Sequence, residues 1–267
     1  MSDQTKLPYK LMAVFTDSKN SLRGNVSAVV ECNELLSTQK MQAIAADLNQ
    51  PATTFITKLE AEQHLISWFA PDAEIMLCGH GTAAATAFFA GENQGKDFRF
   101  QYAEGEIHGK IEDNQRISIF LDAIPVIRPL SIPKELSEGL GIEIESYFET
   151  SNKNIVLAKS ENDVATMKPD FDVLRKMETF AYAVTAKGEK VDFVSRTFIP
   201  HVQQLEDPAT GSSHAALAPF WAEILGKNEM ESRQLSKRGG KFLISLHNNI
   251  VQLNCESEIL AEGFVYA

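Results

Sequence analysis

Cys78-Gly79-His80-Gly81-Thr82-Ala83-Ala84 returns, about half a chain length later, as Thr210-Gly211-Ser212-Ser213-His214-Ala215-Ala216. Each copy reads as a glycine turn that opens an alanine-rich amphipathic helix. The first turn of a helix leaves backbone N–H groups unpaired, and the positive end of the helix dipole lies there. Two such helix starts facing each other would bind an anion, typically a carboxylate, from both sides. The repeat therefore predicts two similar halves with a carboxylate site in a cleft between them.

The segments that follow the two copies also repeat. Gln101–Leu121 reads as strand, turn and strand, with the turn at Asp113-Asn114-Gln115, and Gln234–Asn254 reads the same way around His247-Asn248-Asn249. Repetition of both the helix start and the hairpin favours duplication of a half-length domain over chance. We expect an N-terminal half over residues 1–125 and a C-terminal half over residues 126–267. The proline-rich stretch Pro125–Pro133 is the predicted linker.

Hydrophobic periodicity predicts a mixture of strands and helices, with several strands around one central helix in each half. The central helices are expected over Gly79–Ala90 and Ser212–Leu225. Further helices are expected at Thr38–Leu48, Lys134–Leu140 and Phe171–Met177. Strands are expected at Tyr9–Phe15, Val26–Glu31, Thr53–Thr57, His64–Phe69, Tyr147–Thr150, Ile155–Ala158, Phe180–Thr185 and Val191–Phe198.

Composition excludes several functional classes. The chain has 267 residues, of which 44% are hydrophobic, and a net charge of −11 at pH 7. Nucleic-acid partners are not expected, because phosphate backbones are bound by clustered Lys and Arg. No stretch approaches the roughly 18 apolar residues of a membrane span, and the start, Met1–Lys10, is polar without a signal core. We expect a soluble, cytoplasmic protein with no membrane partner.

Cysteine and histidine usage predicts no metal site. The three cysteines, Cys32, Cys78 and Cys255, are far apart and outline neither a disulfide framework nor a zinc site. The six histidines lack the spacing of metal ligands on a helix. Cys78 differs from the other two, because a thiol at a helix N-terminus has a lowered pKa. The alternative for Cys78 is a small residue packed beside the turn.

Several motifs together resemble the phenazine-biosynthesis PhzF-like family. They run from about Val14 to the C-terminus and comprise Arg23-Gly24-Asn25, Trp68-Phe69-Ala70-Pro71, Leu77-Cys78-Gly79-His80-Gly81-Thr82, Ser195-Arg196-Thr197-Phe198-Ile199-Pro200 and Glu206-Asp207-Pro208-Ala209-Thr210-Gly211-Ser212-Ser213-His214. The resemblance implies the α+β diaminopimelate-epimerase-like fold, in which two pseudo-symmetric halves each wrap a β-barrel-like sheet around a central helix. It also implies an active-site cleft between the halves, a cytoplasmic homodimer, and chemistry that needs no metal or organic cofactor.

Comparison of the two helix starts excludes a two-thiol racemase. Related racemases place a cysteine at both central helices, to exchange a proton on opposite faces of a carbon. Here the first position is Cys78 and the second is Thr210. A threonine hydroxyl is a poor proton acceptor at neutral pH, because its pKa lies far above that of a thiol.

The resemblance assigns proton chemistry to three positions, His80, Asp207 and Ser212, and to a glutamate in a Ser-Glu-Thr-x-Phe segment. That segment aligns with Pro51-Ala52-Thr53-Thr54-Phe55, so Ala52 stands where the glutamate is expected. Losing a positioned acid or base typically costs about 10²- to 10⁴-fold in rate. Three alternatives remain open: Asp207 and His80 form an acid–base pair, Cys78 acts as the base, or a ligand binds without turnover.

Carboxylate binding does not need the missing glutamate. The backbone N–H groups of the glycine turns and one serine hydroxyl suit a substrate carboxylate, and the candidates are Gly79, Gly211, Ser212, Ser213 and Asn25. Asn25 is equally well read as an ordinary turn asparagine. The alternative for Asp207 is a helix-capping residue. Two functions are therefore expected. One is a cofactor-independent isomerase that transfers a proton on a small carboxylic acid, and the alternative is a catalytically degenerate carboxylate-binding protein.

Overall fold

The structure is a computed structural model that describes residues 5–60, 62–91 and 95–267. The first four residues of the polar start, Met1–Lys10, lie outside this described part. The chain forms two compact units, and each is described by itself. Unit 1 comprises Met1–Ser18, Arg23–Leu121 and Asn254–Ala267, and unit 2 comprises Lys19–Leu22 and Asp122–Leu253.

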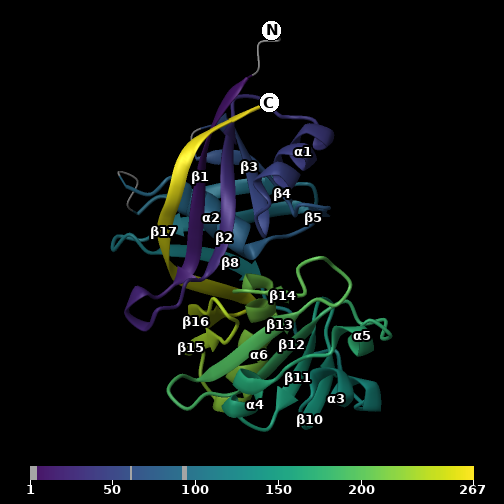
Figure 1. Ribbon diagram of the computed structural model, residues 1–267. Coiled ribbons are helices and arrows are strands. Elements are labelled where there is room, and N and C mark those ends of the chain that lie inside the picture. The colour runs from purple at the N-terminus through teal and green to yellow at the C-terminus, as the bar shows by residue number, and fades with distance from the viewer. Residues whose placement is uncertain (1–4, 61, 92–94) are drawn as a thin grey trace. The chain divides into compact units, whose positions relative to one another are not determined.

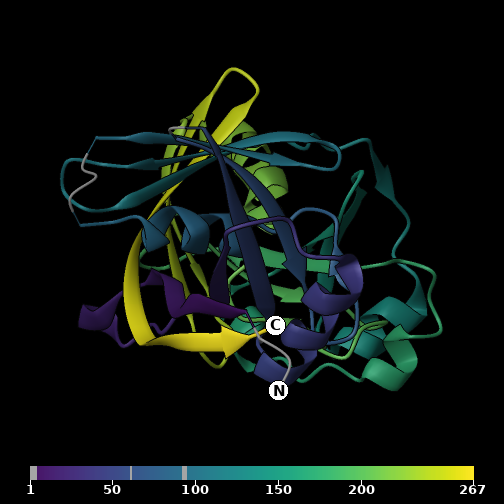
Figure 2. The ribbon, with the colours of Figure 1, turned by 90° about the horizontal axis from the view of Figure 1, so that it is seen from above.

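Eight strands of the described chain close into a ring in unit 1. Each strand pairs with the next, and the last pairs with the first, in the order β1 (Lys6–Thr16), β2 (Asn25–Cys32), β3 (Ala52–Glu60), β4 (Gln63–Phe69), β6 (Asp97–Tyr102), β7 (Gly105–Ile111), β8 (Ile117–Asp122) and β17 (Ile250–Tyr266). The closing pair joins the two ends of the sequence, with Lys6 opposite Tyr266. Figures 1 and 2 show β17, in yellow, beside the purple β1.

The central helix of unit 1 is α2 (Gly79–Phe88), and it packs on β1, β2, β3 and β7. All residues from Gly79 to Ala87 are buried. A helix that is apolar all round needs cover on every side, and the ring of strands supplies it. The other elements of this unit are α1 (Thr38–Leu48), the short strand β5 (Glu74–Ile75) and, at the junction with unit 2, the 3₁₀ turn η1 (Ser18–Asn20).

Unit 2 repeats the strand pattern of unit 1. Its sheet runs through β9 (Arg128–Leu130), β10 (Ile144–Glu149), β11 (Asn154–Ala158), β12 (Tyr182–Lys187), β13 (Phe193–Phe198), β15 (Glu229–Gln234) and β16 (Gly240–His247). From β10 to β16 the pairings alternate antiparallel and parallel as they do from β1 to β7. The short β14 (Glu206–Asp207) pairs with β13 just as β5 pairs with β4.

The central helix of unit 2 is α6 (Gly211–Leu225), which packs on β15 and β16. Pro219 lies inside it and cannot donate a hydrogen bond to the carbonyl of Ala215. The backbone N–H of Ile124 donates to that carbonyl at 2.9 Å, so the interruption leaves no unsatisfied acceptor there. The remaining helices of unit 2 are α3 (Lys134–Leu140), α4 (Glu161–Thr166) and α5 (Phe171–Leu174).

The structure bears on the predicted linker and on the division of the chain into two units. The predicted linker Pro125–Pro133 is partly wrong, because residues 128–130 form β9 and Pro129 lies opposite Phe148 in an antiparallel pair. The domain boundary at 125/126 stays a prediction. In the structure the chain passes from unit 1 to unit 2 between residues 121 and 122. Residues 254–267 belong to unit 1, because β17 continues past the hairpin and pairs with β1. Within the described ranges, no helix is long and apolar enough to cross a bilayer.

Candidate functional site

The start of α2 brings Cys78 and His80 together. Cys78 is the N-cap residue, and its sulfur accepts the backbone N–H of Gly81 at 3.3 Å. The same sulfur lies 3.5 Å from His80 Nδ1 and 3.7 Å from Nε2. Both side chains are buried, with exposed fractions of 4% and 7%. A thiol and an imidazole at this separation can exchange a proton, and the helix dipole favours negative charge on the sulfur.

Strand β3 passes beside this helix start and carries Ala52. A Cβ atom at position 81 would lie only 2.8 Å from Thr54 Oγ1, so Thr54 faces the first turn of α2. Ala52 is two residues earlier and shares that face of β3, because side chains alternate along a strand. It is fully buried, and its carbonyl accepts the hydroxyl of Ser27 at 3.0 Å. Position 52 thus carries a methyl group on the face of β3 that packs against α2.

Asn25 begins β2 and is fully buried in unit 1. Its Oδ1 accepts the backbone N–H of Val26 at 2.9 Å, which is a local contact typical of a turn asparagine. A role for Asn25 in substrate binding stays a prediction.

The start of α6 differs from that of α2, although its backbone begins the same way. Thr210 is the N-cap residue, and its side chain does not cap the helix. Its hydroxyl instead accepts a hydrogen bond from Gln234 Nε2 at 3.0 Å. The Ser213 hydroxyl is buried and lies 2.8 Å from Thr197 Oγ1, so this residue can offer a ligand only its backbone N–H. Gly211 is buried, whereas Ser212 is half-buried.

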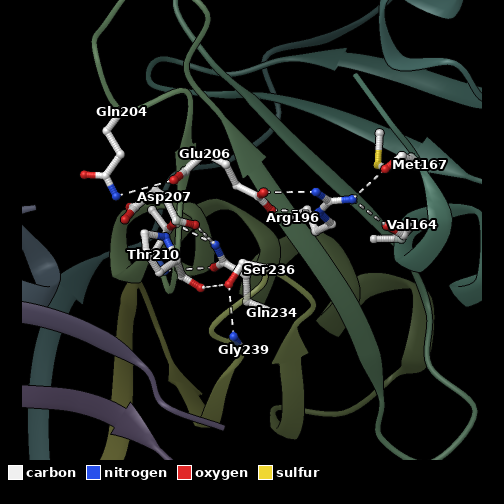
Figure 3. Close-up of polar contacts among 11 residues, drawn as sticks. Val164, Met167, Arg196, Gln204, Glu206, Asp207, Thr210, Gln234, Ser236 and Gly239 are labelled. Carbon is white, nitrogen blue, oxygen red and sulfur yellow. Dashed lines mark hydrogen bonds and ion pairs between the residues drawn. The ribbon is translucent and has the colours of Figure 1, made fainter. Parts of the chain in front are cut away.

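Asp207 lies in β14, three residues before the N-cap Thr210. Gln234 clamps this approach to the helix, because its Nε2 donates to the Asp207 carbonyl at 2.5 Å and its Oε1 accepts the Thr210 N–H at 2.8 Å (Figure 3). Ser236 adds a third contact by donating to the Pro208 carbonyl at 2.6 Å. The backbone that carries Asp207 into α6 is therefore held by side chains of β15 and the turn after it.

Glu206, the neighbour of Asp207, forms a two-pronged ion pair with Arg196. Arg196 Nε and Nη2 donate to the two carboxylate oxygens at 2.7 and 2.9 Å (Figure 3). Arg196 Nη1 also donates to the carbonyl of Met167 at 3.0 Å. The Arg196 side chain is only 12% exposed. This residue therefore fixes β14 and is not a solvated surface cation.

Two residues of this region are not predicted by the sequence motifs. The sequence places Gln234 only in a hairpin strand, and it gives Lys153 no role. Lys153 is 6% exposed, and its Nζ donates to Ser212 Oγ at 2.8 Å. It directly precedes Asn154, which begins β11, just as Gly24 precedes Asn25 at the start of β2. Alignment of the two halves at these strand starts, in addition to the helix starts, would have drawn attention to Lys153.

His214 belongs to the second motif but acts as a structural residue. Burial lowers its pKa from 6.5 to about 4, so the ring is neutral at physiological pH. Its ring nitrogens lie 2.8 Å from the Thr210 carbonyl and 2.8 Å from Ser232 Oγ, and Phe242 stacks on it at 3.6 Å between centroids. The ring is fully buried, which keeps it from a substrate.

The candidate residues form two groups. Cys78, Gly79, His80 and Ala52 gather in unit 1, whereas Asp207, Gly211, Ser212, Ser213 and Lys153 gather in unit 2. That both groups face one substrate stays a prediction. In the described part of the chain, no three His, Cys, Asp or Glu side chains are grouped so that they could hold a metal ion.

The three buried cysteines provide a test of the helix start. Burial raises the pKa of Cys32 to about 11 and that of Cys255 to about 12, so roughly one thiol in a thousand or fewer is ionised at pH 8. We predict that iodoacetamide at pH 8 alkylates Cys78 at least about tenfold faster than either, because thiolate is the reactive form. Peptide mass spectrometry over time gives the three rates. Equal rates, or fastest labelling of Cys32, would contradict this role of the helix start.

Gln234→Ala tests the clamp on Asp207. The substitution leaves the buried Thr210 N–H and hydroxyl without their amide partner, and each unsatisfied group costs about 1–3 kcal/mol. We expect the free energy of unfolding to fall by about 2–4 kcal/mol in urea denaturation. Gln204→Ala is the control, because Gln204 is half-buried and makes a 3.4 Å contact with the Glu206 carbonyl. Similar losses for the two variants would contradict the clamp.

Comparison with known proteins agrees with this architecture. The family model described as phenazine biosynthesis-like protein matches residues 12–262. An uncharacterized isomerase of Pseudomonas aeruginosa is 33% identical over 92% of this chain and 94% of its own. The crystal structure of a PhzF family protein from Enterococcus faecalis superposes with a TM-score of 0.89 at 30% identity, over 98% of this chain and 100% of that one.

A more distant structure bears on the fold alone. A hydroxyproline epimerase of Agrobacterium vitis superposes with a TM-score of 0.69 at 9% identity, over 100% of this chain and 94% of that one. The predicted α+β epimerase-like fold is thereby confirmed. The resemblance expected from the sequence motifs is confirmed as well. The chain belongs to the phenazine biosynthesis-like (PhzC/PhzF) family.

Proposed function

We propose that this protein is an isomerase that moves a proton on a small carboxylic acid, with Cys78 and His80 as its proton-transfer pair. The 3.5 Å contact between Cys78 Sγ and His80 Nδ1 at the start of α2 carries the proposal. The names of the related isomerases support the reaction class. The relatives' names leave the substrate open, and the carboxylate is inferred from the helix starts.

The pair can supply a base in a buried setting. His80 takes the thiol proton, and the resulting thiolate is stabilised by the Gly81 N–H and the dipole of α2. The thiolate then removes a proton from a substrate carbon that is acidified by conjugation with the carboxylate. The electron pair of that C–H bond shifts the double bond, and a proton is returned to another carbon. Asp207 is the candidate donor for that return, as the family resemblance implied. Afterwards Asp207 takes up a proton and His80 releases the one it took from the thiol, so that both groups regain their starting state.

The other helix start suits the substrate carboxylate. The Ser212 hydroxyl and the first N–H groups of α6 are hydrogen-bond donors at the positive end of a 15-residue helix. Negative charge develops on the carboxylate when the carbon loses its proton, so donors placed there stabilise the transition state more than the ground state. Binding and proton transfer thus fall to different helix starts.

A second function is favoured by Ala52. Position 52 carries a methyl group where the family resemblance implies a glutamate, and an alanine cannot carry a proton. A protein with this substitution and no replacement base would bind a carboxylate without turning it over. Homodimer formation, cytoplasmic location and independence from metals and cofactors stay predictions.

The isomerase proposal predicts that deuterium from D₂O enters the carbon skeleton of at least one member of a panel of unsaturated and amino carboxylic acids. We expect Cys78→Ser to lower the rate by about 10²- to 10⁴-fold, the usual loss for a general base, and Asp207→Asn to abolish it. Mass spectrometry of the recovered acids measures the exchange. Cys255→Ser, at a buried thiol far from α2 in sequence, serves as the control and should retain the wild-type rate.

Ala52→Glu separates the two functions. If the wild-type protein only binds, carboxylates raise its melting temperature without exchange, and Ala52→Glu introduces deuterium exchange. No exchange by the wild type across the whole panel would contradict the isomerase proposal. Exchange by the wild type that Cys78→Ser leaves unchanged would contradict the assignment of the base.

A further inference from the structure

Lys153 is a buried lysine in contact with Ser212, in the first turn of α6. Its side chain is 6% exposed, and its Nζ donates to Ser212 Oγ at 2.8 Å and to Asn152 Oδ1 at 2.5 Å. Lysine is rarely buried to this degree, because the ammonium group loses its hydration. A buried lysine aimed at a helix start therefore calls for a functional explanation.

The turn that carries Lys153 is rigid. Thr150 Oγ1 donates to the Lys153 carbonyl at 2.8 Å and accepts the Asn152 N–H at 3.2 Å. Asn154 accepts the Thr150 N–H at 3.3 Å and donates from Nδ2 to the Tyr147 hydroxyl at 2.8 Å. These contacts fix the backbone on both sides of Lys153. The ammonium group is thus presented from a prearranged position.

The contact with Ser212 has a definite polarity. An ammonium group carries three hydrogens and no acceptor, so the Ser212 oxygen accepts this bond. The hydroxyl hydrogen of Ser212 must then point away from Lys153, where it can act as a donor. In the described part of the chain, Lys153 is the one recorded hydrogen-bond partner of the Ser212 hydroxyl. Lys153 therefore sets the orientation in which Ser212 meets a ligand.

Charge at this place favours an anion twice over. The positive end of α6 and the Lys153 ammonium lie at the same first turn, and both stabilise a negative charge there. A carboxylate gains from both contributions, whereas a neutral amide of the same shape gains much less.

We propose that Lys153 is the positioning and specificity residue of the carboxylate site, holding Ser212 as a donor and selecting anionic over neutral ligands. The inference rests on the proposed function only for the use of the α6 start as the carboxylate site, and it does not require turnover. It adds a lysine from the β10–β11 turn to a site that the sequence motifs confined to residues around α6.

The test measures binding alone. Thermal shift and calorimetric titration are run with benzoate and crotonate as probes, and with benzamide and crotonamide as neutral counterparts of the same shape. We expect both carboxylates to bind the wild type at least about tenfold more tightly than the amides, because charge-assisted hydrogen bonds are stronger than neutral ones. Their binding should weaken as salt is raised. Lys153→Met should lose at least about tenfold in carboxylate affinity and lose the preference over the amides.

Three further variants separate the charge of Lys153, and its contact with Ser212, from general effects on the protein. Lys159→Met removes an exposed lysine next to the end of β11 and should bind like the wild type. Lys153→Gln keeps a donor without the charge, serves if Lys153→Met does not fold, and should also lose the preference for carboxylates. Lys153→Met in a Ser212→Ala background should cost less than in the wild type, because the two residues act through one contact.

Every outcome of these measurements either supports or overturns the proposed role of Lys153. Retained preference for carboxylates in both Lys153 variants would overturn the inference. It would also be overturned if neither carboxylate binds the wild type more tightly than its amide counterpart. A lowered melting temperature of the ligand-free Lys153 variants with unchanged carboxylate preference would assign the lysine to stability and likewise overturn it. Loss of carboxylate preference in a protein that shows no deuterium exchange would support the inference and reject the isomerase proposal.

Discussion

The first turn of a helix needs partners for its backbone N–H groups, and the two units meet this need in different ways. In α2 the sulfur of Cys78 accepts the Gly81 N–H and lies against His80. In α6 the corresponding side chain, Thr210, is turned toward Gln234 and does not cap the helix. One buried glutamine thus leaves the second helix start without a side-chain cap from its N-cap residue, while the first already holds a polarisable, ionisable atom.

This difference gives one scaffold two chemical roles. The units share the order and direction of their strands, so the second helix residue occupies the same place in each: His80 in unit 1 and Ser212 in unit 2. His80 is coupled to a thiol and suits proton transfer. Ser212 is coupled to the Lys153 ammonium and suits recognition of a charge. A duplicated fold that kept two identical helix starts would instead favour the symmetric chemistry of a two-base racemase.

Sequence reasoning succeeded where the determining contacts are local. The bounds of α1 follow from Ser37, whose hydroxyl accepts the Lys40 N–H, and from Asn49, which adopts the left-handed conformation at the C-terminus. The helix starts were recognised from their glycines and from the repeat. Helix and hairpin patterns are set by neighbours along the chain, which is why periodicity and turn residues reveal them.

Contacts between distant segments escaped prediction. The extension of β17 to Tyr266 depends on pairing with β1 at the other end of the chain, and β9 forms because β10 lies beside it in spite of Pro129. Lys153 and Gln234 reach the α6 start from other strands. Ser213 carries the same side chain as Ser212, yet it points to Thr197 and is buried. Residue type in a motif therefore identified the two helix starts but not which of their side chains are buried against other strands.

The different roles proposed for the two helix starts require that α6, and not α2, receives the carboxylate. Titration of the ¹⁵N-labelled protein with benzoate, followed through the backbone amide resonances, tests it directly, with benzamide as the neutral control. We expect saturable benzoate-dependent shifts at the amides of Gly211 and Ser212, several times larger than at Gly81, whose N–H is already bound to the Cys78 sulfur. Shifts of equal size at the two helix starts, or none at Gly211 and Ser212, would contradict it.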